Sequence, residues 1–406
     1  MIFLLQFVSC SYLSKHSKRA QDHRSFLLEY KGSEELTALS NQEPNFGART
    51  MGQRKVQKKQ AWQWRSTFAI GAAPQSYSRI QFVQGLKILI STLGGGLECR
   101  DVQSNKIYWK AKFPMGVAAD PYVDGSSVAF ISLDGEFQKR RLSDGQIMWQ
   151  KNFNAGSYAS VVGDQSNYYL VGAHERVVAL NKKTGEVAWQ SFHKSERSER
   201  WSLRGQGRGA VDLSGKRLYL GFSDGYVKAF ATDSGRVQWK RHFSKRDSRF
   251  QDVDLDLLLN KSKTTLYLCT IDGDLLALSA RSGSTLWRHP ARCVSAPLYV
   301  AEEEALYFYD GFGHVKKLSA KNGTELWSNN LALKAYVSTP VAVGKNLLAF
   351  TESAGGKLYL LDRKNGSLQK ARQVARGILA PPAFNGRDLF LLSPRNHLHH
   401  FQYRQR

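Results

Sequence analysis

The residues best suited to chemistry lie in two neighbouring segments of the chain. The first, HKSERSERWSLRGQGRG, contains Trp201, Leu203 and Arg204, which are residue types that anchor protein interfaces. The second, RHFSKRDSRFQDVDLD, contains Asp252 and Asp254, whose carboxylates accept hydrogen bonds from a partner's cations or backbone amides. We expect these residues to bind a partner. The plainer alternative is that both segments are solvated charged loops.

Motifs for catalysis are missing from the sequence. It contains no serine elbow, no phosphate-binding loop and no pair of carboxylates in an acid/base context. His397, His399 and His400 form its one histidine cluster, and strand spacing would place only the first two on one side. We therefore expect these histidines at the surface, no metal site, no cofactor and no enzyme activity.

The four cysteines form no CxxC pair and have no metal-ligand spacing. Disulfide scaffolding and structural zinc are therefore not expected. Cys99, Cys269 and Cys293 have apolar neighbours, which favours small buried residues on strands.

Cys10 has a different context. Residues 1–9 read MIFLLQFVS, an apolar run that ends in a small residue before Cys10, and this resembles a bacterial lipobox. The alternative is an ordinary apolar N-terminus with an incidental cysteine. We expect residues 1–10 to act as a lipoprotein signal that leaves Cys10 lipidated. By resemblance to lipoprotein sorting rules, Ser11 after the cysteine favours the outer membrane. Residues 11–60 are polar and basic, which is typical of a flexible tether.

The remaining residues, 61–406, carry a repeat. Six segments place a turn four residues before a tryptophan: SNKIYW, DGQIMW, TGEVAW, SGRVQW, SGSTLW and NGTELW. Each is preceded by a second turn and by alternating apolar and polar residues, as in YVKAF at 226–230. Four short strands in a unit of about 40 residues predict a propeller blade.

Counting the units predicts an all-β, eight-bladed β-propeller of four-stranded antiparallel blades. A seventh unit has Lys370 at the tryptophan position, and the eighth begins at Asp388 but lacks a fourth strand before the chain stops. The segment AWQWRSTF at 61–68, which contains Trp64, supplies a strand that closes the last blade and hides two strand edges.

The recurring tryptophan has a structural interpretation. A large aromatic residue at one fixed position of every blade packs against the neighbouring blade while its indole N–H finds a carbonyl. A ligand site would not need the same residue in every blade. The intervals after Trp189 and Trp239 are the long ones, and part of each excess lies in the two segments described first. Because equivalent connections leave a propeller on the same face, we expect one raised patch there.

The formal net charge of +24 predicts attraction to anionic partners. No run resembles an RNA-binding sheet motif or a basic recognition helix, so specific nucleic-acid binding is not expected. The alternative interpretation of the net charge is an ordinary solvated basic surface.

The segment Ser202-Leu203-Arg204-Gly205, followed one blade later by Asp252-Val253-Asp254, resembles the BamB family. That family comprises the lipoprotein propellers of the outer-membrane β-barrel assembly machine, and the resemblance covers about residues 62–405. The blade repeat alone is shared with pyrroloquinoline-quinone dehydrogenases, so the two loop motifs are the specific part. The sequence departs from the family pattern at two places, which bear on the detailed surface of the partner. Trp201 stands where the family usually has leucine, and residues 255–257 read LDL instead of small residues and proline.

The resemblance implies a non-enzymatic scaffold on the periplasmic face of the outer membrane. It would bind the periplasmic repeat domains of the core barrel subunit through Trp201, Leu203, Arg204, Asp252 and Asp254, as a monomer within a hetero-complex. It would also help to present unfolded outer-membrane proteins. Two alternatives remain: an envelope-anchored propeller that binds anionic polysaccharide or lipid, and a quinone-dependent dehydrogenase.

Overall fold

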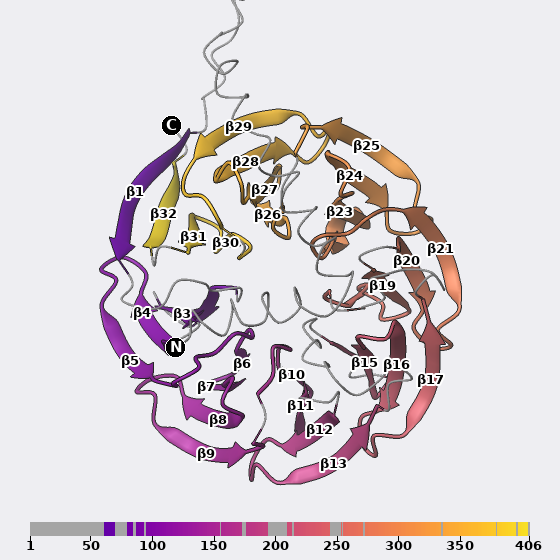
Figure 1. Ribbon diagram of the computed structural model, residues 1–406. Coiled ribbons are helices and arrows are strands. Elements are labelled where there is room, and N and C mark those ends of the chain that lie inside the picture. Colours follow the sequence, from indigo (N-terminus) through magenta and orange to yellow (C-terminus); the bar gives the residue numbers. More distant parts are fainter. Residues whose placement is uncertain are drawn as a thin grey trace, which may run out of the picture. The chain divides into compact units, whose positions relative to one another are not determined.

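The computed structural model of the chain describes residues 61–69, 79–83, 87–92, 95–154, 156–172, 176–193, 209–212, 215–243, 253, 255–270, 273–333, 336–378, 380–394 and 397–404. These residues form eight four-stranded antiparallel sheets set around a ring (Figure 1). The predicted eight-bladed β-propeller is therefore confirmed. No helix within the described ranges is long and apolar enough to cross a membrane.

The first four blades follow one another in chain order. Blade 1 consists of β2 (Gln81–Val83), β3 (Lys87–Thr92), β4 (Gly96–Asp101) and β5 (Ile107–Ala111). Blade 2 consists of β6 (Tyr122–Asp124), β7 (Ser127–Ile131), β8 (Glu136–Arg141) and β9 (Ile147–Asn152). Blade 3 consists of β10 (Val162–Gly163), β11 (Asn167–Val171), β12 (Arg176–Asn181) and β13 (Val187–Phe192). Blade 4 consists of β14 (Ala210–Asp212), β15 (Arg217–Gly221), β16 (Tyr226–Ala231) and β17 (Val237–His242).

The other four blades complete the ring. Blade 5 consists of β18 (Leu258–Leu259), β19 (Thr265–Cys269), β20 (Asp274–Ser279) and β21 (Thr285–Pro290). Blade 6 consists of β22 (Leu298–Val300), a 3-10 helix η3 (Ala301–Glu303), β23 (Ala305–Tyr309), β24 (His314–Ser319) and β25 (Glu325–Asn330). Blade 7 consists of β26 (Val341–Val343), β27 (Leu347–Glu352), β28 (Lys357–Asp362) and β29 (Leu368–Gln373). Blade 8 consists of β30 (Ala383–Phe384), β31 (Asp388–Ser393), β32 (His397–Arg404) and β1 (Ala61–Ala69).

The chain closes its own ring in blade 8. The strand β1 pairs antiparallel with β32, and Trp64 lies opposite Phe401 in the register. The predicted closure by the segment before blade 1 is therefore confirmed. It covers the free edge of β32, which would otherwise be open to another chain.

The core is divided into eight apolar clusters, one at each interface between neighbouring blades. The two middle strands of a blade are buried on both faces because a neighbouring blade covers each side. All five residues of β7 are buried, for example, whereas the outermost strand β9 has no buried residue. This layering explains why the middle strands are continuous apolar runs, whereas the outer strands mix polar and apolar residues.

The repeated tryptophan and the turn glycine belong to one contact between consecutive blades. Each tryptophan donates its indole N–H to the carbonyl of the residue that follows the third strand of the next blade, at 2.8–3.1 Å. Its ring also covers that blade's turn glycine, where an added Cβ would lie 2.4–2.7 Å from ring atoms. These glycines have φ between +68° and +75°, a region that other residues rarely adopt. The predicted structural role of the tryptophans is therefore confirmed.

This contact also explains why blade 7 carries Lys370 at the tryptophan position. A tryptophan on β29 would need a turn glycine in blade 8, but there the third and fourth strands come from opposite ends of the chain. The interface instead has a small hollow lined by Lys370, Arg372 and apolar side chains. The Arg372 guanidinium lies 5.5 Å from the centre of the Phe401 ring.

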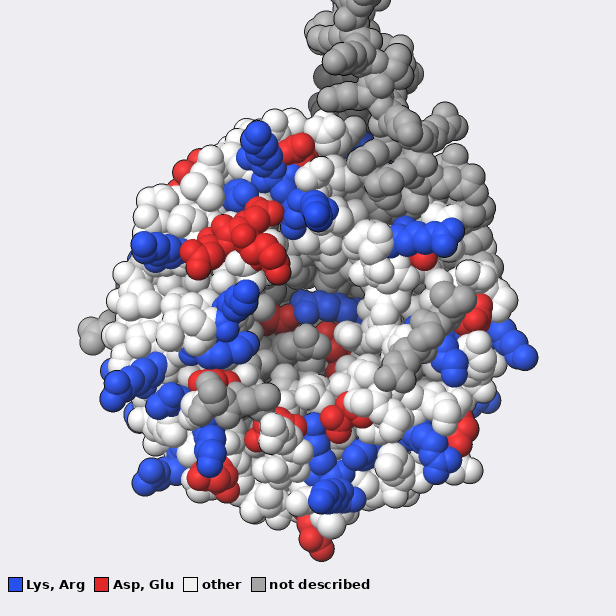
Figure 2. Space-filling model, turned by 180° about the vertical axis from the view of Figure 1, so that it is seen from behind, with Lys and Arg blue, Asp and Glu red and all other residues white. Residues whose placement is uncertain are grey.

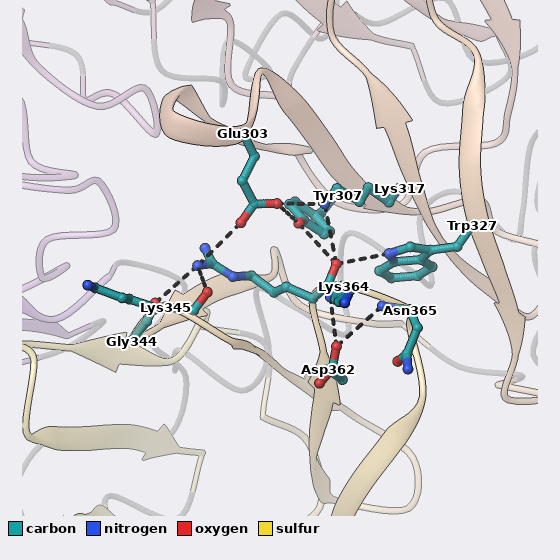
Figure 3. Close-up of polar contacts among 10 residues, drawn as sticks. Glu303, Tyr307, Lys317, Trp327, Gly344, Lys345, Asp362, Lys364 and Asn365 are labelled. Atoms are coloured by element: carbon teal, nitrogen blue, oxygen red, sulfur yellow. Dashed lines mark hydrogen bonds and ion pairs between the residues drawn. The ribbon is translucent and has the colours of Figure 1, made fainter.

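Charged groups also join the blades. In Figure 3 the Glu303 carboxylate of blade 6 accepts hydrogen bonds from Tyr307 and from Lys317, the latter at 2.6 Å, and it pairs with Arg363 of blade 7 at 3.3 Å. Trp327 donates to the Arg363 carbonyl at 3.0 Å. Burial acts to raise the pKa of Glu303, but the hydrogen bonds and the two cations outweigh it and hold that pKa below its usual value.

Two expectations about cysteine and histidine were wrong. Cys269, at the end of β19, forms a disulfide with Cys293, which lies in a loop and not on a strand; their Cα atoms are 5.9 Å apart. The sequence did not show that the two blades bring these residues together. Cys99 is a buried free thiol, as expected, and burial raises its pKa to about 11.

Two of the three clustered histidines near the end of the chain do not lie at the surface. His399 and His400 are buried, because β32 is an inner strand of blade 8 once β1 covers it. His400 Nε2 lies 2.8 Å from Asp388 Oδ1. Burial, together with the neighbouring His397, lowers the pKa of His399 to about 4.

Candidate functional site

The antiparallel order of the strands sorts the loops onto two rims of the ring. Links from one blade to the next, and turns between the second and third strands, lie on one rim, which we call the connection rim. The other turns lie on the opposite rim, which we call the hairpin rim. The two long segments found in the sequence run from β13 to β14 and from β17 to β18, so they are both links of the connection rim.

One turn of blade 4 holds the beginning of the first long link. His193 follows β13 directly, and its Nε2 lies 2.7 Å from Oδ2 of Asp224, in the turn between β15 and β16. Both side chains are about 5% exposed or less. The His193 ring also lies against Phe222, with ring centres 4.2 Å apart. The first link is therefore attached to the turn formed by residues 222–225.

The same turn holds the second long link at three points. Phe243, just after β17, donates its backbone N–H to the Gly225 carbonyl at 3.0 Å, and His242 Nε2 lies 2.9 Å from the Asp224 carbonyl oxygen. Further along, the Val253 N–H donates to the Phe222 carbonyl at 3.1 Å. The Val253 side chain is buried in the apolar cluster between blades 4 and 5. Turn 222–225 is thus a common support for both links.

The packing at this support is close. A Cβ added to Gly221 would lie 2.3 Å from the Val253 carbonyl oxygen, so only glycine lets the second link approach β15 this closely. Burial acts to raise the pKa of Asp224, but the hydrogen bond and charge of His193 outweigh it and lower that pKa below its ordinary value. The Asp224 carboxylate therefore stays ionised at neutral pH and remains hydrogen-bonded to His193.

The residues predicted to contact a partner, Trp201, Leu203, Arg204, Asp252 and Asp254, lie outside the described residues, as does the lipidation candidate Cys10. Those assignments remain predictions. What the structure describes is the chain that flanks them.

The sequence showed Asp224-Gly225 only as an ordinary hairpin turn. The contacts of Asp224 with His193 and of Phe222 with Val253 were missed, because they join residues about 30 positions apart that meet only when neighbouring blades pack. A histidine directly after an outer strand, facing a turn Asp-Gly one blade later, is the signal that was available.

Large apolar side chains are also exposed on the connection rim. Met115, Tyr158 and Tyr336 lie in links between blades, Phe192 ends β13, and Phe312 lies in the turn between β23 and β24; their exposed fractions range from 37% to 65%. Arg176 and Arg292 lie over the Phe192 and Phe312 rings, at 5.6 and 5.9 Å from the ring centres. Aromatic and arginine side chains of this kind are typical of protein interfaces.

The described part of the chain contains no group of three histidine, cysteine, aspartate or glutamate side chains placed to hold a metal ion.

A family model described as outer membrane protein assembly factor BamB matches residues 55–152, 140–292 and 258–378. The chain belongs to the BamB family. Curated BamB proteins from Legionella pneumophila and Shewanella oneidensis are 28% and 26% identical over 181 and 187 residues. These matches cover 43% and 45% of this chain and 46% and 45% of the relatives, so the chain aligns with about half the length of the curated relatives.

Solved structures share the fold. BamB from Moraxella catarrhalis superposes with a TM-score of 0.71 at 16% identity, over 84% of this chain and 100% of that one. A quinohemoprotein alcohol dehydrogenase from Comamonas testosteroni superposes with a TM-score of 0.67 at 11% identity, over 84% of this chain and 76% of that one. At these identities the likeness concerns the propeller alone.

Proposed function

We propose that this BamB-family protein is a non-enzymatic scaffold of the outer-membrane protein assembly machine. Its connection rim binds the periplasmic repeat domains of the core barrel subunit, through Trp201, Leu203 and Arg204 on the first long link and Asp252 and Asp254 on the second. The observation that carries this proposal is the common support at turn 222–225, because it ties the flanks of both links to one rigid blade. Two loops on one support can act as a single binding surface.

The exposed apolar residues of the same rim support the second part of the proposal. Unfolded outer-membrane proteins present alternating apolar side chains, and Met115, Phe192 and Phe312 offer apolar contacts on the connection rim. We propose that the rim helps to deliver such chains to the core subunit while they are still unfolded.

We propose a periplasmic location on the outer membrane, with the anchor at Cys10. The disulfide between Cys269 and Cys293 supports a compartment outside the cytoplasm, because disulfides persist in oxidising surroundings. Labelling cells with a radioactive fatty acid tests the anchor. The wild-type protein should take up label and Cys10→Ser should not, and an unlabelled wild-type protein would contradict the anchor.

The binding proposal is tested by pull-down of the purified periplasmic repeat domains of the core subunit. The variant Arg204→Ala with Asp254→Ala should lose binding while its thermal stability stays within a few degrees of wild type. The matched control is Asp233→Ala with Arg281→Ala, which removes one acid and one base from exposed positions on the hairpin rim of blades 4 and 5. Binding that survives the first variant, or is lost equally in the control, would overturn the proposal.

A second candidate function rests on the net charge of +24. An envelope propeller of this charge would bind anionic polysaccharide or lipid, with an affinity that falls steeply as salt rises. Figure 2 shows one face of the ring, where lysine and arginine are spread around the circumference among acidic residues and form no single patch. Binding to vesicles that contain an anionic lipid distinguishes the scaffold function from the anionic-ligand function. The anionic-ligand function requires salt-sensitive vesicle binding that the variant Arg204→Ala with Asp254→Ala leaves unchanged. Quinone absorbance in the purified protein would instead indicate the third possibility, a dehydrogenase.

A further inference from the structure

An ion pair spans the centre of the propeller. Arg79 lies just before β2 of blade 1, and Asp256 lies just before β18 of blade 5. These blades stand on opposite sides of the ring (Figure 1). Nevertheless Arg79 Nη2 lies 2.5 Å from Asp256 Oδ2, and the two side chains are only 28% and 14% exposed. The pair therefore crosses the axis, at the level where the innermost strands begin on the connection rim.

Arg79 is held there by further groups. Its backbone N–H donates to Asp120 Oδ1 of blade 2 at 2.6 Å, and the Asp120 N–H donates to the Ser160 hydroxyl at the start of blade 3 at 3.2 Å. Burial acts to lower the pKa of Arg79, but Asp256, Asp120 and Tyr336 together raise it above its usual value. The guanidinium is thus a permanent cation, surrounded by groups from blades 2, 5 and 7.

The acceptor of this ion pair belongs to the second long link. Val253 is fixed to turn 222–225, and Leu257 is buried in the cluster between blades 4 and 5. Leu255 packs against the next cluster, between blades 5 and 6. Asp256 reaches toward the axis, where its carboxylate meets the Arg79 guanidinium.

We infer that Arg79 is a positioning residue for the second long link: reaching across the ring, it holds Asp256 and so fixes residues 255–257, the described stretch that leads into blade 5. The inference rests on the proposed function where partner binding is measured, but not where hydrogen exchange of the protein alone is measured. It also gives a role to Asp256, which departs from the small residues and proline expected there by resemblance. In Figure 2 the centre of the ring is a hollow that contains charged side chains of both signs, consistent with charge filling the axis.

Hydrogen exchange of the full-length protein, followed by mass spectrometry, tests the structural part without a partner. In Arg79→Gln and Asp256→Asn, amides of residues 255–257 should exchange about ten- to a hundredfold faster, the range that corresponds to losing a hydrogen bond to a charged group. Exchange in the described strands of blade 8 should not change. The matched control is Arg141→Gln, which breaks an exposed arginine–aspartate pair with Asp144 at 2.7 Å on the hairpin rim.

The charge-swapped double variant Arg79→Asp with Asp256→Arg separates positioning from general destabilisation. It should recover most of the protection of residues 255–257, and most of the affinity for the core subunit's repeat domains that either single charge reversal loses. Unchanged exchange in both single variants, or a double variant whose effects simply add, would overturn the inference. If the wild-type protein does not bind the repeat domains at all, the proposed function fails, and the exchange measurements still decide whether Arg79 holds the link.

Discussion

The contact between Gly235 and Trp189 allows the cost of one methyl group to be worked out from the structure. In Gly235→Ala the new Cβ would lie 2.4 Å from Trp189 Cε3, well inside van der Waals contact. The ring cannot move away easily, because Trp189 is 8% exposed and its indole N–H donates to the Thr232 carbonyl at 2.8 Å. Overpacking of this kind costs about 1–3 kcal/mol. The backbone at φ +68° adds about 1–2 kcal/mol for any residue with a Cβ.

We therefore expect Gly235→Ala to lower the free energy of unfolding by about 2–5 kcal/mol, measured by denaturant unfolding of the purified protein. Gly125→Ala is the matched control. Its φ is +58° and no heavy atom lies within 4 Å of the added Cβ, so it reports the backbone cost alone. If Gly235→Ala lowers the free energy of unfolding no more than Gly125→Ala does, the tryptophan ring does not restrict the turn glycine.

A double-mutant cycle sharpens the result. In a Trp189→Leu background the ring is gone, and Gly235→Ala should then cost only the backbone term, leaving a coupling of about 1–3 kcal/mol between the two positions. Zero coupling would mean that the glycine is required only for its φ angle and that the tryptophan above it is incidental.

Three further outcomes are expected. Cys269→Ser, which breaks the disulfide with Cys293, should destabilise the oxidised protein by about 3 kcal/mol and abolish the effect of a reductant on its melting temperature; an unchanged response to reductant would contradict the pairing. The pKa of Glu303 is depressed in the folded state, so its stabilising effect is present above about pH 4.5 and lost as the pH falls through the folded-state pKa. Glu303→Gln should therefore destabilise the protein more at pH 7 than at pH 3 in thermal melts, and an equal loss at both would refute this. Deletion of residues 1–69 removes β1 and should expose the edge of β32, so light scattering should show association that deletion of residues 1–57 does not cause.

The blade pattern could be predicted because it depends on neighbours in the chain. Turn residues such as Asp224-Gly225, alternating strands and the tryptophan spacing are local features, and repetition made them easy to recognise. The closure by the strand containing Trp64 followed from counting, since the eighth unit lacked one strand. The indole contact with a neighbouring carbonyl followed from the chemistry of a buried tryptophan.

Other features depended on the tertiary structure. The disulfide between Cys269 and Cys293, the burial of His400 and the pair of His193 with Asp224 each join residues whose meeting depends on how blades and chain ends pack. The ion pair of Arg79 with Asp256 joins residues 177 positions apart. The repeat predicts which residues belong to each blade. Only closure of the ring brings opposite blades close enough for a side chain of one to contact the other. Because charge interactions act over a few ångströms, that distance, and not the spacing in the chain, decides which groups become partners.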